Sequence, residues 1–127
     1  MPLKHHLVWE NWLPKQSPSV QQNLDYFTQL LCEVDLKVYP RMSYGVPFLY
    51  RLGPIGYFNT DKIGLYFGFY WGKLLLNEPG SVILHPDDRK MVKLVYLEGK
   101  EENEEFLGNL LVLFDKALQK DQEKYGK

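Results

Sequence analysis

The spacing of the apolar residues changes near residue 40, and this change limits the folds that the chain can adopt. Before it, the apolar residues recur at intervals of four, three, four and three, as on one face of an amphipathic helix: Val20, Leu24, Phe27, Leu31 and Val34. Ser19 is the expected N-cap, with Gln22 three residues later as in a capping box. We expect the helix to end near Asp35, because Pro40 disfavours helical backbone in the residue before it.

From Pro47 to Trp71 the apolar spacing becomes two, which is typical of strands. Three such runs are separated by short turn-forming segments: Phe48–Leu52, Ile55–Phe58 and Ile63–Tyr70. Short turns between strands predict an antiparallel meander. In the third run we expect one set of alternating side chains in the core, namely Leu65, Phe67, Phe69 and Trp71. The residues between them, Tyr66, Gly68 and Tyr70, then face the other way.

Two later segments complete the expected fold. Met91–Leu97 alternates well enough to form a further strand, and Phe106–Leu118 carries a wide apolar helical face behind a run of acidic residues. The helices and the sheet each have one apolar face to bury. The sequence therefore predicts an α+β fold, a two-layer sandwich in which the N- and C-terminal helices pack on an antiparallel β-sheet.

The length of 127 residues is that of one domain. We expect residues 1–18 to form an irregular arm that is held onto the domain by Trp9, Trp12 and Leu13. Residues 19–120 would form the α+β domain. Residues 121–127 would be a polar tail that frays.

Composition argues against several classes of partner. The net charge is −1, with 15 basic and 16 acidic residues, so the chain lacks the positive field that attracts nucleic acid. No stretch approaches the roughly 20 apolar residues of a membrane span, and the N-terminus lacks the apolar core of a signal peptide. The single cysteine, Cys32, fits a reducing compartment. We therefore expect a cytoplasmic protein with no nucleic-acid or membrane partner.

The sequence contains no recognisable catalytic motif, which favours a protein that is not an enzyme and has no cofactor. Cys32 lacks the base and orienting group that a nucleophile needs, so a structural role is the simpler interpretation. His85 with Asp87 or Asp88 could supply acid–base chemistry, but the same segment has the composition of a turn. The pair His5-His6 is expected to be solvated.

Tyrosines form the strongest candidate site. The expected ligand-binding residues are Tyr44, Tyr50, Tyr57, Tyr66, Tyr70 and Arg89. Several of these rings would stand on neighbouring strands beside Gly56, Gly64 and Gly68, where small residues could leave room for a flat or apolar ligand. The alternatives are a protein partner, a homodimer interface, or a face covered by the N-terminal arm.

Four segments resemble a known bacterial family: MSYGVPFLYR, GYFN, IGLYFGFYWGKLL and DDRKMVKLVYL, followed by the final apolar helix. They are similar to the YdhG-like domains of unknown function, some of which are labelled frataxin-like iron chaperones. The resemblance covers about residues 20–118. It implies helices packed on a curved antiparallel sheet, and it raises the alternative of weakly bound iron. Glu33 and Asp35 are the acids that we would assign to such a metal, in line with the preference of hard cations for carboxylates.

Overall fold

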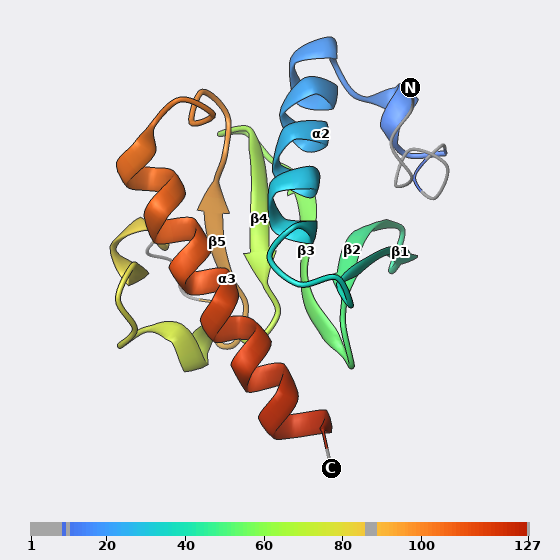
Figure 1. The fold of residues 1–127 in the computed structure, drawn as a ribbon. Helices are drawn as coiled ribbons and strands as arrows, with labels where there is room; N and C mark the ends of the chain where they lie inside the picture. Colours follow the sequence, from blue (N-terminus) through green and yellow to red (C-terminus); the bar gives the residue numbers. More distant parts are fainter. Residues whose placement is uncertain (1–8, 10, 86–88, 127) are drawn as a thin grey trace.

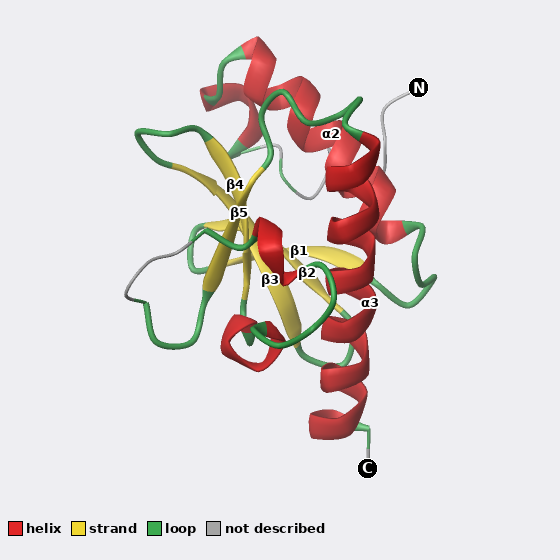
Figure 2. Cartoon of the chain, turned by 90° about the vertical axis from the view of Figure 1, so that its left-hand side faces the viewer, coloured by secondary structure: helices red, strands yellow, loops and turns green. Residues whose placement is uncertain are grey.

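The computed structural model describes Trp9, residues 11–85 and residues 89–126. Its strands form one open five-stranded sheet in the order β1-β2-β3-β4-β5, with every neighbouring pair antiparallel. The strands are β1 (Tyr39–Ser43), β2 (Val46–Tyr50), β3 (Pro54–Thr60), β4 (Leu65–Phe69) and β5 (Lys93–Tyr96). The long helices α2 (Pro18–Cys32) and α3 (Glu104–Tyr125) lie on one side of this sheet (Figures 1 and 2). The predicted α+β fold is therefore confirmed.

The core lies between the helices and the sheet. Alternation places Leu65, Phe67 and Phe69 of β4 in it, each completely buried, as the sequence predicts. The prediction is wrong for Trp71, which follows the end of β4 and is only partly buried outside the core cluster. Leu24 and Phe27 of α2 enter the same cluster. The helices bring further apolar side chains to it, and those of α3 are Phe106, Leu110, Leu113, Phe114 and Leu118. One layer of helices thus covers one face of the sheet, and neither long helix covers the opposite face.

Helix α2 begins and ends earlier than the sequence pattern indicates. Its N-cap is Ser17 rather than Ser19: the Ser17 Oγ accepts a hydrogen bond of 3.2 Å from the backbone N–H of Val20. Pro18 follows at the first helical position, where its fixed φ fits and its missing N–H costs nothing. The last helical residue is Cys32, so Val34 falls outside the helix and is 36% exposed.

Strand β1 is an element that the apolar pattern does not predict. It pairs with β2 from Tyr39↔Tyr50 to Ser43↔Val46, and it lies at the edge of the sheet. Pro40 lies within β1 and cannot donate to a neighbouring strand, which is tolerated at an edge. The same proline that argues for the end of a helix is thus compatible with an edge strand.

The N-terminal arm packs against the core, as expected from its apolar residues. Trp9 is completely buried, and its ring meets the Phe58 ring edge-on with centroids 5.8 Å apart. Leu13, in the short 3₁₀ helix Leu13–Lys15, is also buried. Phe58 belongs to the core, so the described part of the arm lies on the helical side of the sheet. His5 and His6 lie outside the described residues.

The expected fraying of residues 121–127 is wrong for most of that segment, because α3 continues to Tyr125. Asp121 is only 1% exposed. Its carboxylate accepts backbone hydrogen bonds from Leu52 (3.0 Å) and Gly53 (2.8 Å) in the β2–β3 turn. These long-range bonds fix the last turns of the helix to the sheet, and the local sequence pattern does not predict them.

Candidate functional site

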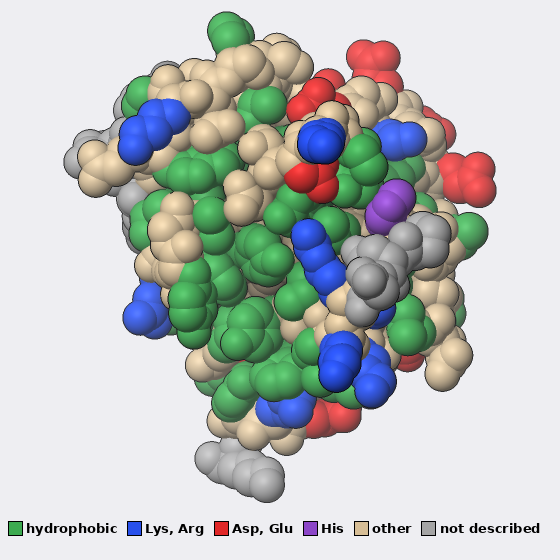
Figure 3. Space-filling view, turned by 180° about the vertical axis from the view of Figure 1, so that it is seen from behind, with side chains coloured by type: hydrophobic (Ala, Val, Ile, Leu, Met, Phe, Trp, Pro, Cys, Tyr) green, Lys and Arg blue, Asp and Glu red, His purple; other side chains and the backbone are tan. Residues whose placement is uncertain are grey.

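A continuous row of aromatic rings crosses the face of the sheet that the helices leave uncovered. We call this the outer face, and the aromatic row consists of Tyr39, Tyr50, Phe48, Tyr57, Tyr66 and Tyr96. Successive ring centroids are 5.2 to 6.1 Å apart, and the row takes at least one ring from each of the five strands. The view from behind shows hydrophobic side chains gathered on this face (Figure 3).

The glycines of this region do not leave the open space that the sequence suggested. Gly68 faces the Tyr57 ring across the β3–β4 pair, and a methyl group added to it would lie 3.1 Å from that ring and 3.1 Å from Val92. A methyl group on Gly56 would instead collide with the core ring of Phe67. At Gly64 it would meet the Glu98 carboxylate. The expectation of a glycine-lined ligand cradle is therefore wrong, since protein side chains or backbone fill all three spaces.

A pocket of 360 Å³ nevertheless opens on the outer face. We call it the Tyr44 pocket; its lining residues are Tyr44, Val46, Phe48, Tyr57, Asn59, Tyr70 and Val92. The volume is at the lower end of that of small-molecule sites. The lining is aromatic and aliphatic apart from one amide and the phenol hydroxyls, and it contains no carboxylate, imidazole or thiol. The pocket is suited to holding a ring rather than to acid–base chemistry.

Three of the predicted ligand-binding residues meet in this pocket, and three do not. Tyr44, Tyr57 and Tyr70 line it, and the Tyr70 ring lies 6.3 Å from that of Phe48. Tyr66 belongs to the aromatic row but is only 5% exposed. The two remaining predicted residues, Tyr50 and Arg89, do not line it: the Tyr50 hydroxyl donates to Ser43 Oγ (3.3 Å), and the Arg89 guanidinium stands 5.9 Å from the Tyr66 ring centroid.

Tyr44 is the most unusual residue of the pocket. It occupies the two-residue loop between the paired residues Ser43 and Val46, with φ of 52°, and Gly45 follows with φ of 75°. Positive φ at both positions is the mark of a type I′ turn, for which Asn-Gly is the preferred sequence. For a residue with a Cβ, the left-handed conformation costs about 1–2 kcal/mol. Yet Tyr44 is 84% exposed, so little packing offsets that cost.

Sequence reasoning missed several residues of this site. Phe48, Val46, Asn59 and Val92 were not predicted to line a pocket. The dipeptide Tyr44-Gly45 was the available signal: read as a hairpin turn, it would have paired the residues before and after it and placed their side chains together. Tyr96 could have been found from the alternation of β5, which sets it on the face opposite to buried Val95.

At the β5 end of the row, Tyr96 and Asp61 form a hydrogen-bonded pair. The Tyr96 hydroxyl donates to Asp61 Oδ2. Burial, together with this bond to a carboxylate, raises the pKa of Tyr96 to about 12. Burial acts to raise the pKa of Asp61, but the hydrogen bonds from Tyr96 and from the backbone N–H groups of Ile63 and Gly64 outweigh it and lower that pKa. This pair is a structural contact, with the phenol protonated at neutral pH.

Of the other candidate catalytic groups, the structure describes His85 and Cys32. The His85 ring packs edge-on against Tyr96, 5.0 Å between centroids, and its backbone N–H donates to Leu94 O (2.7 Å). Asp87 and Asp88, its proposed partners, lie outside the described residues. Burial and the neighbouring Glu33 carboxylate raise the pKa of Cys32 to about 11, so its thiol is protonated at neutral pH. A protonated, partly buried thiol fits the structural role expected for it.

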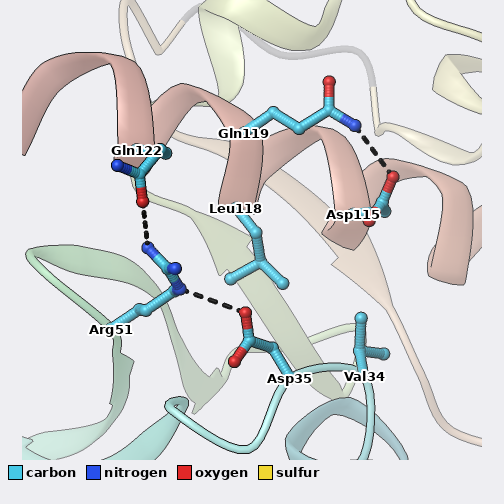
Figure 4. Close-up of a pocket in the computed structure, with 7 residues that line it drawn as sticks. All are labelled: Val34, Asp35, Arg51, Asp115, Leu118, Gln119 and Gln122. Carbon is cyan, nitrogen blue, oxygen red and sulfur yellow. Dashed lines mark hydrogen bonds and ion pairs between the residues drawn. The ribbon is translucent and has the colours of Figure 1, made fainter. Parts of the chain in front are cut away.

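Asp35, one of the two acids assigned to a possible iron ion, is held by other groups (Figure 4). Its Oδ1 accepts the backbone N–H of Lys37 (2.8 Å), and its Oδ2 accepts Arg51 Nε (3.1 Å). The hydrogen bond from Lys37, followed by the charge and hydrogen bond of Arg51, lowers the pKa of Asp35 against the effect of burial. Glu33 accepts a hydrogen bond from Gln29 Nε2 (3.3 Å). Within residues 11–85 and 89–126, with Trp9, no three His, Cys, Asp or Glu side chains gather as metal ligands.

Arg51 joins three parts of the chain rather than forming a ligand site. Besides Asp35, it donates from Nη1 to Gln122 Oε1 (2.9 Å) and lies 3.5 Å from the Asp121 carboxylate. The cavity beside it, of 210 Å³, lies between α3 and the segment after α2 (Figure 4). Every charged group in this network has a protein partner, so we interpret it as a clamp that fixes α3 to the end of β2.

Comparison with known proteins gives no functional information: no family model, no curated protein and no solved structure matches this chain. The resemblance to YdhG-like domains therefore stays a prediction. Among the helices of the described residues, none is both long and apolar enough to cross a membrane.

Proposed function

We propose that this chain is a non-enzymatic binding domain whose Tyr44 pocket accepts an aromatic group of a small molecule. The observation that carries the proposal is Tyr44 itself. A large ring stands 84% exposed, in a backbone conformation that its side chain disfavours, at the edge of an aromatic pocket. Backbone strain of this kind is maintained at functional sites, where it positions a side chain.

The surroundings of Tyr44 are suited to this role. Its ring lies 5.8 Å from that of Phe48, which in turn stacks on Tyr57 at 5.2 Å with an interplanar angle of 28°. Phe48 is only 3% exposed, so its ring is held rigidly as the floor of the pocket. An incoming ring would lie against a fixed floor and beneath an exposed aromatic wall, the arrangement in which aromatic pairs gain about 0.5–1.5 kcal/mol beyond burial.

The pocket lining contains no carboxylate, imidazole, amine or thiol, which favours binding over catalysis. A reaction would need an acid, a base or a nucleophile within hydrogen-bond reach of the ligand. Apart from the phenol hydroxyls, the only polar side chain in the lining is Asn59, and its Oδ1 already accepts the backbone N–H of Thr60 (2.8 Å). The side chain that remains to interact with a ligand is an amide, which can orient a ligand but does not titrate.

Indole is a suitable probe because it is a neutral ring with nine non-hydrogen atoms. At roughly 0.5 kcal/mol per atom it would bind with about 4 kcal/mol, a Kd near 1 mM. In carbon–proton correlation spectra of protein with ¹³C-labelled tyrosine, indole should shift the ring signals of Tyr44, Tyr57 and Tyr70. Tyr44→Ala should abolish the shifts at the other two rings. Tyr39→Ala, which removes a ring of the same face outside the pocket, should leave them unchanged.

Two results would overturn the proposal. One is the absence of any tyrosine shift at 5 mM indole, a concentration chosen as about five times the expected Kd. The other is a dependence of the Tyr44 and Tyr57 signals on protein concentration without indole, which would make the outer face a homodimer interface. A protein partner and weakly bound iron at Glu33 and Asp35 stay predictions from the sequence, without a contact in the structure that favours them.

A further inference from the structure

We propose that the group taken by the Tyr44 pocket carries an anion on a short arm, with Arg41 as its counter-charge. This inference rests on the proposed function and names its ligand class: an aromatic or heteroaromatic ring bearing a carboxylate, or another anionic group, one or two carbon atoms away. It concerns the charge of the ligand, which the aromatic lining by itself leaves open.

The β1–β2 register places Arg41 beside the pocket. Arg41 is the direct partner of Phe48 across the strand pair, and residues opposite each other in an antiparallel pair project on the same face, with Cβ atoms about 4.5–5.5 Å apart. Phe48 is the pocket floor. The Arg41 guanidinium is 4.8 Å from the ring centroid of Tyr50, whose own ring is 5.8 Å from that of Phe48. A cation is therefore held one ring away from the place where the ligand ring would lie.

In the described part of the chain, Arg41 has no acidic partner to neutralise it. Among the described residues no carboxylate lies within ion-pair distance of its guanidinium, and the side chain is exposed. By contrast, Arg51 at the end of the next strand is matched by Asp35 and Asp121. An arginine that is ordered over a ring and remains available for a carboxylate fits the recognition of an anionic ligand.

The charges around the pocket favour a negatively charged ligand. The pocket lining holds no carboxylate. Asp61 keeps its negative charge in the bond to the Tyr96 hydroxyl, but it stands at the far end of the aromatic row and does not line the pocket. A second arginine, Arg89, stands over the Tyr66 ring at 5.9 Å. Aromatic pockets can also bind quaternary ammonium groups, but a cationic ligand here would be repelled by Arg41.

Three ligands with the same ring test the inference: indole, indole-3-acetate and tryptamine, which are neutral, anionic and cationic at pH 7. Their affinities are measured from the ¹³C-tyrosine shifts at low salt. For one partly exposed charge pair we expect indole-3-acetate to bind about threefold to fivefold more tightly than indole, and tryptamine more weakly than indole. The difference should shrink at 0.5 M NaCl, because salt screens charges at the surface.

Variants of Arg41 separate charge from packing. Arg41→Gln should abolish the preference for indole-3-acetate while indole binds as before, and Arg41→Lys should keep most of the preference because the charge is retained. Lys100→Gln is the matched control, since Lys100 stands over the Phe106 ring (5.6 Å) and does not line the Tyr44 pocket. It should change none of the three affinities.

The failures of the two proposals are distinguishable. Equal affinity of all three ligands at Tyr44, or tightest binding of tryptamine, would overturn the anionic ligand and leave the aromatic pocket standing. A preference for indole-3-acetate that survives in Arg41→Gln would equally refute the role of Arg41. If none of the three ligands shifted the Tyr44 signals, the proposal that the Tyr44 pocket binds an aromatic group would be wrong.

Discussion

Replacing Tyr44 tests whether this residue is kept for a role other than stability. Asn and Ala each remove the ring, but they differ in backbone preference. Asn tolerates the left-handed conformation found at residue 44 (φ of 52°), and Asn-Gly is the preferred pair of a type I′ turn. Ala has the same Cβ clash but lacks the short polar side chain with which Asn hydrogen-bonds locally in this conformation.

The structure gives the size of each contribution. With 84% of Tyr44 exposed, only about one sixth of its roughly 200 Å² is covered. That is about 30 Å², or about 0.8 kcal/mol at 25 cal/mol per Å². Both variants lose this amount, whereas only Asn relieves a backbone strain of about 1–2 kcal/mol. Tyr44→Asn should therefore be more stable than Tyr44→Ala by about 1 kcal/mol, and at least as stable as the wild type.

Urea denaturation followed by circular dichroism measures these free energies of unfolding. A difference of 1 kcal/mol corresponds to about 4 °C in Tm for a domain of this size, so thermal unfolding gives a second measurement. Indole binding should be lost in both variants, which separates the ring's role in binding from its effect on stability. If Tyr44→Asn were no more stable than Tyr44→Ala, the argument that this turn is strained would be wrong.

Three further predictions test the fold and the unused groups. Asp121→Ala should lower the free energy of unfolding by about 3 kcal/mol, because it leaves the N–H groups of Leu52 and Gly53 without their acceptor and removes one of the two carboxylates beside Arg51. Asp115→Ala, at an exposed site of the same helix, should change that free energy by less than 0.5 kcal/mol. Equal effects of the two substitutions in urea denaturation would contradict the clamp. Gly56→Ala should destabilise the protein by about 2–3 kcal/mol, since the new methyl group would collide with Phe67 and with the Gly68 carbonyl. Gly108→Ala, in open space on α3, should instead stabilise the protein by about 0.8 kcal/mol. If Gly56→Ala were as stable as the wild type, the description of the β3–β4 packing would be wrong. The Cys32 thiol, whose pKa is raised to about 11, forms thiolate only as the pH rises towards that value. Its alkylation by iodoacetamide at pH 8 should therefore be about 100-fold slower than that of a thiol of pKa 9. After unfolding in urea the ordinary rate should return, and a fast reaction in the folded protein would refute the raised pKa.

Periodicity predicted the parts of the fold that are determined by burial. The intervals of α2 and the alternation of β4 follow from which side chains face the core, and Leu24, Phe27, Phe67 and Phe69 are all completely buried. These predictions use only the geometry of a single helix or strand. They therefore succeed wherever one face of an element is apolar and the other is not.

The missed features depend on contacts between distant residues or on special backbone positions. Strand β1 was hidden by Pro40, and its pairing depends on the turn at Tyr44-Gly45. The end of α3 is fixed by Asp121, which bonds residues about 70 positions earlier.

The candidate site was predicted only in part. Tyr44, Tyr57 and Tyr70 were identified as site residues, but the shape of their pocket depends on Phe48 and Val92, which β2 and the segment before β5 bring together. Arg41 could not be connected to the site without the register that sets it opposite Phe48.

Intermolecular nuclear Overhauser effects between indole and methyl groups of the protein test the central claim most directly. Val46 and Val92 line the Tyr44 pocket, whereas Val82 and Val112 are exposed elsewhere, 81% and 38% respectively. We predict contacts from the indole ring protons to the methyl groups of Val46 and Val92 and none to those of Val82 and Val112. Contacts to Val82 or Val112 without contacts to Val46 and Val92 would contradict the claim that the outer face of the sheet is the binding surface.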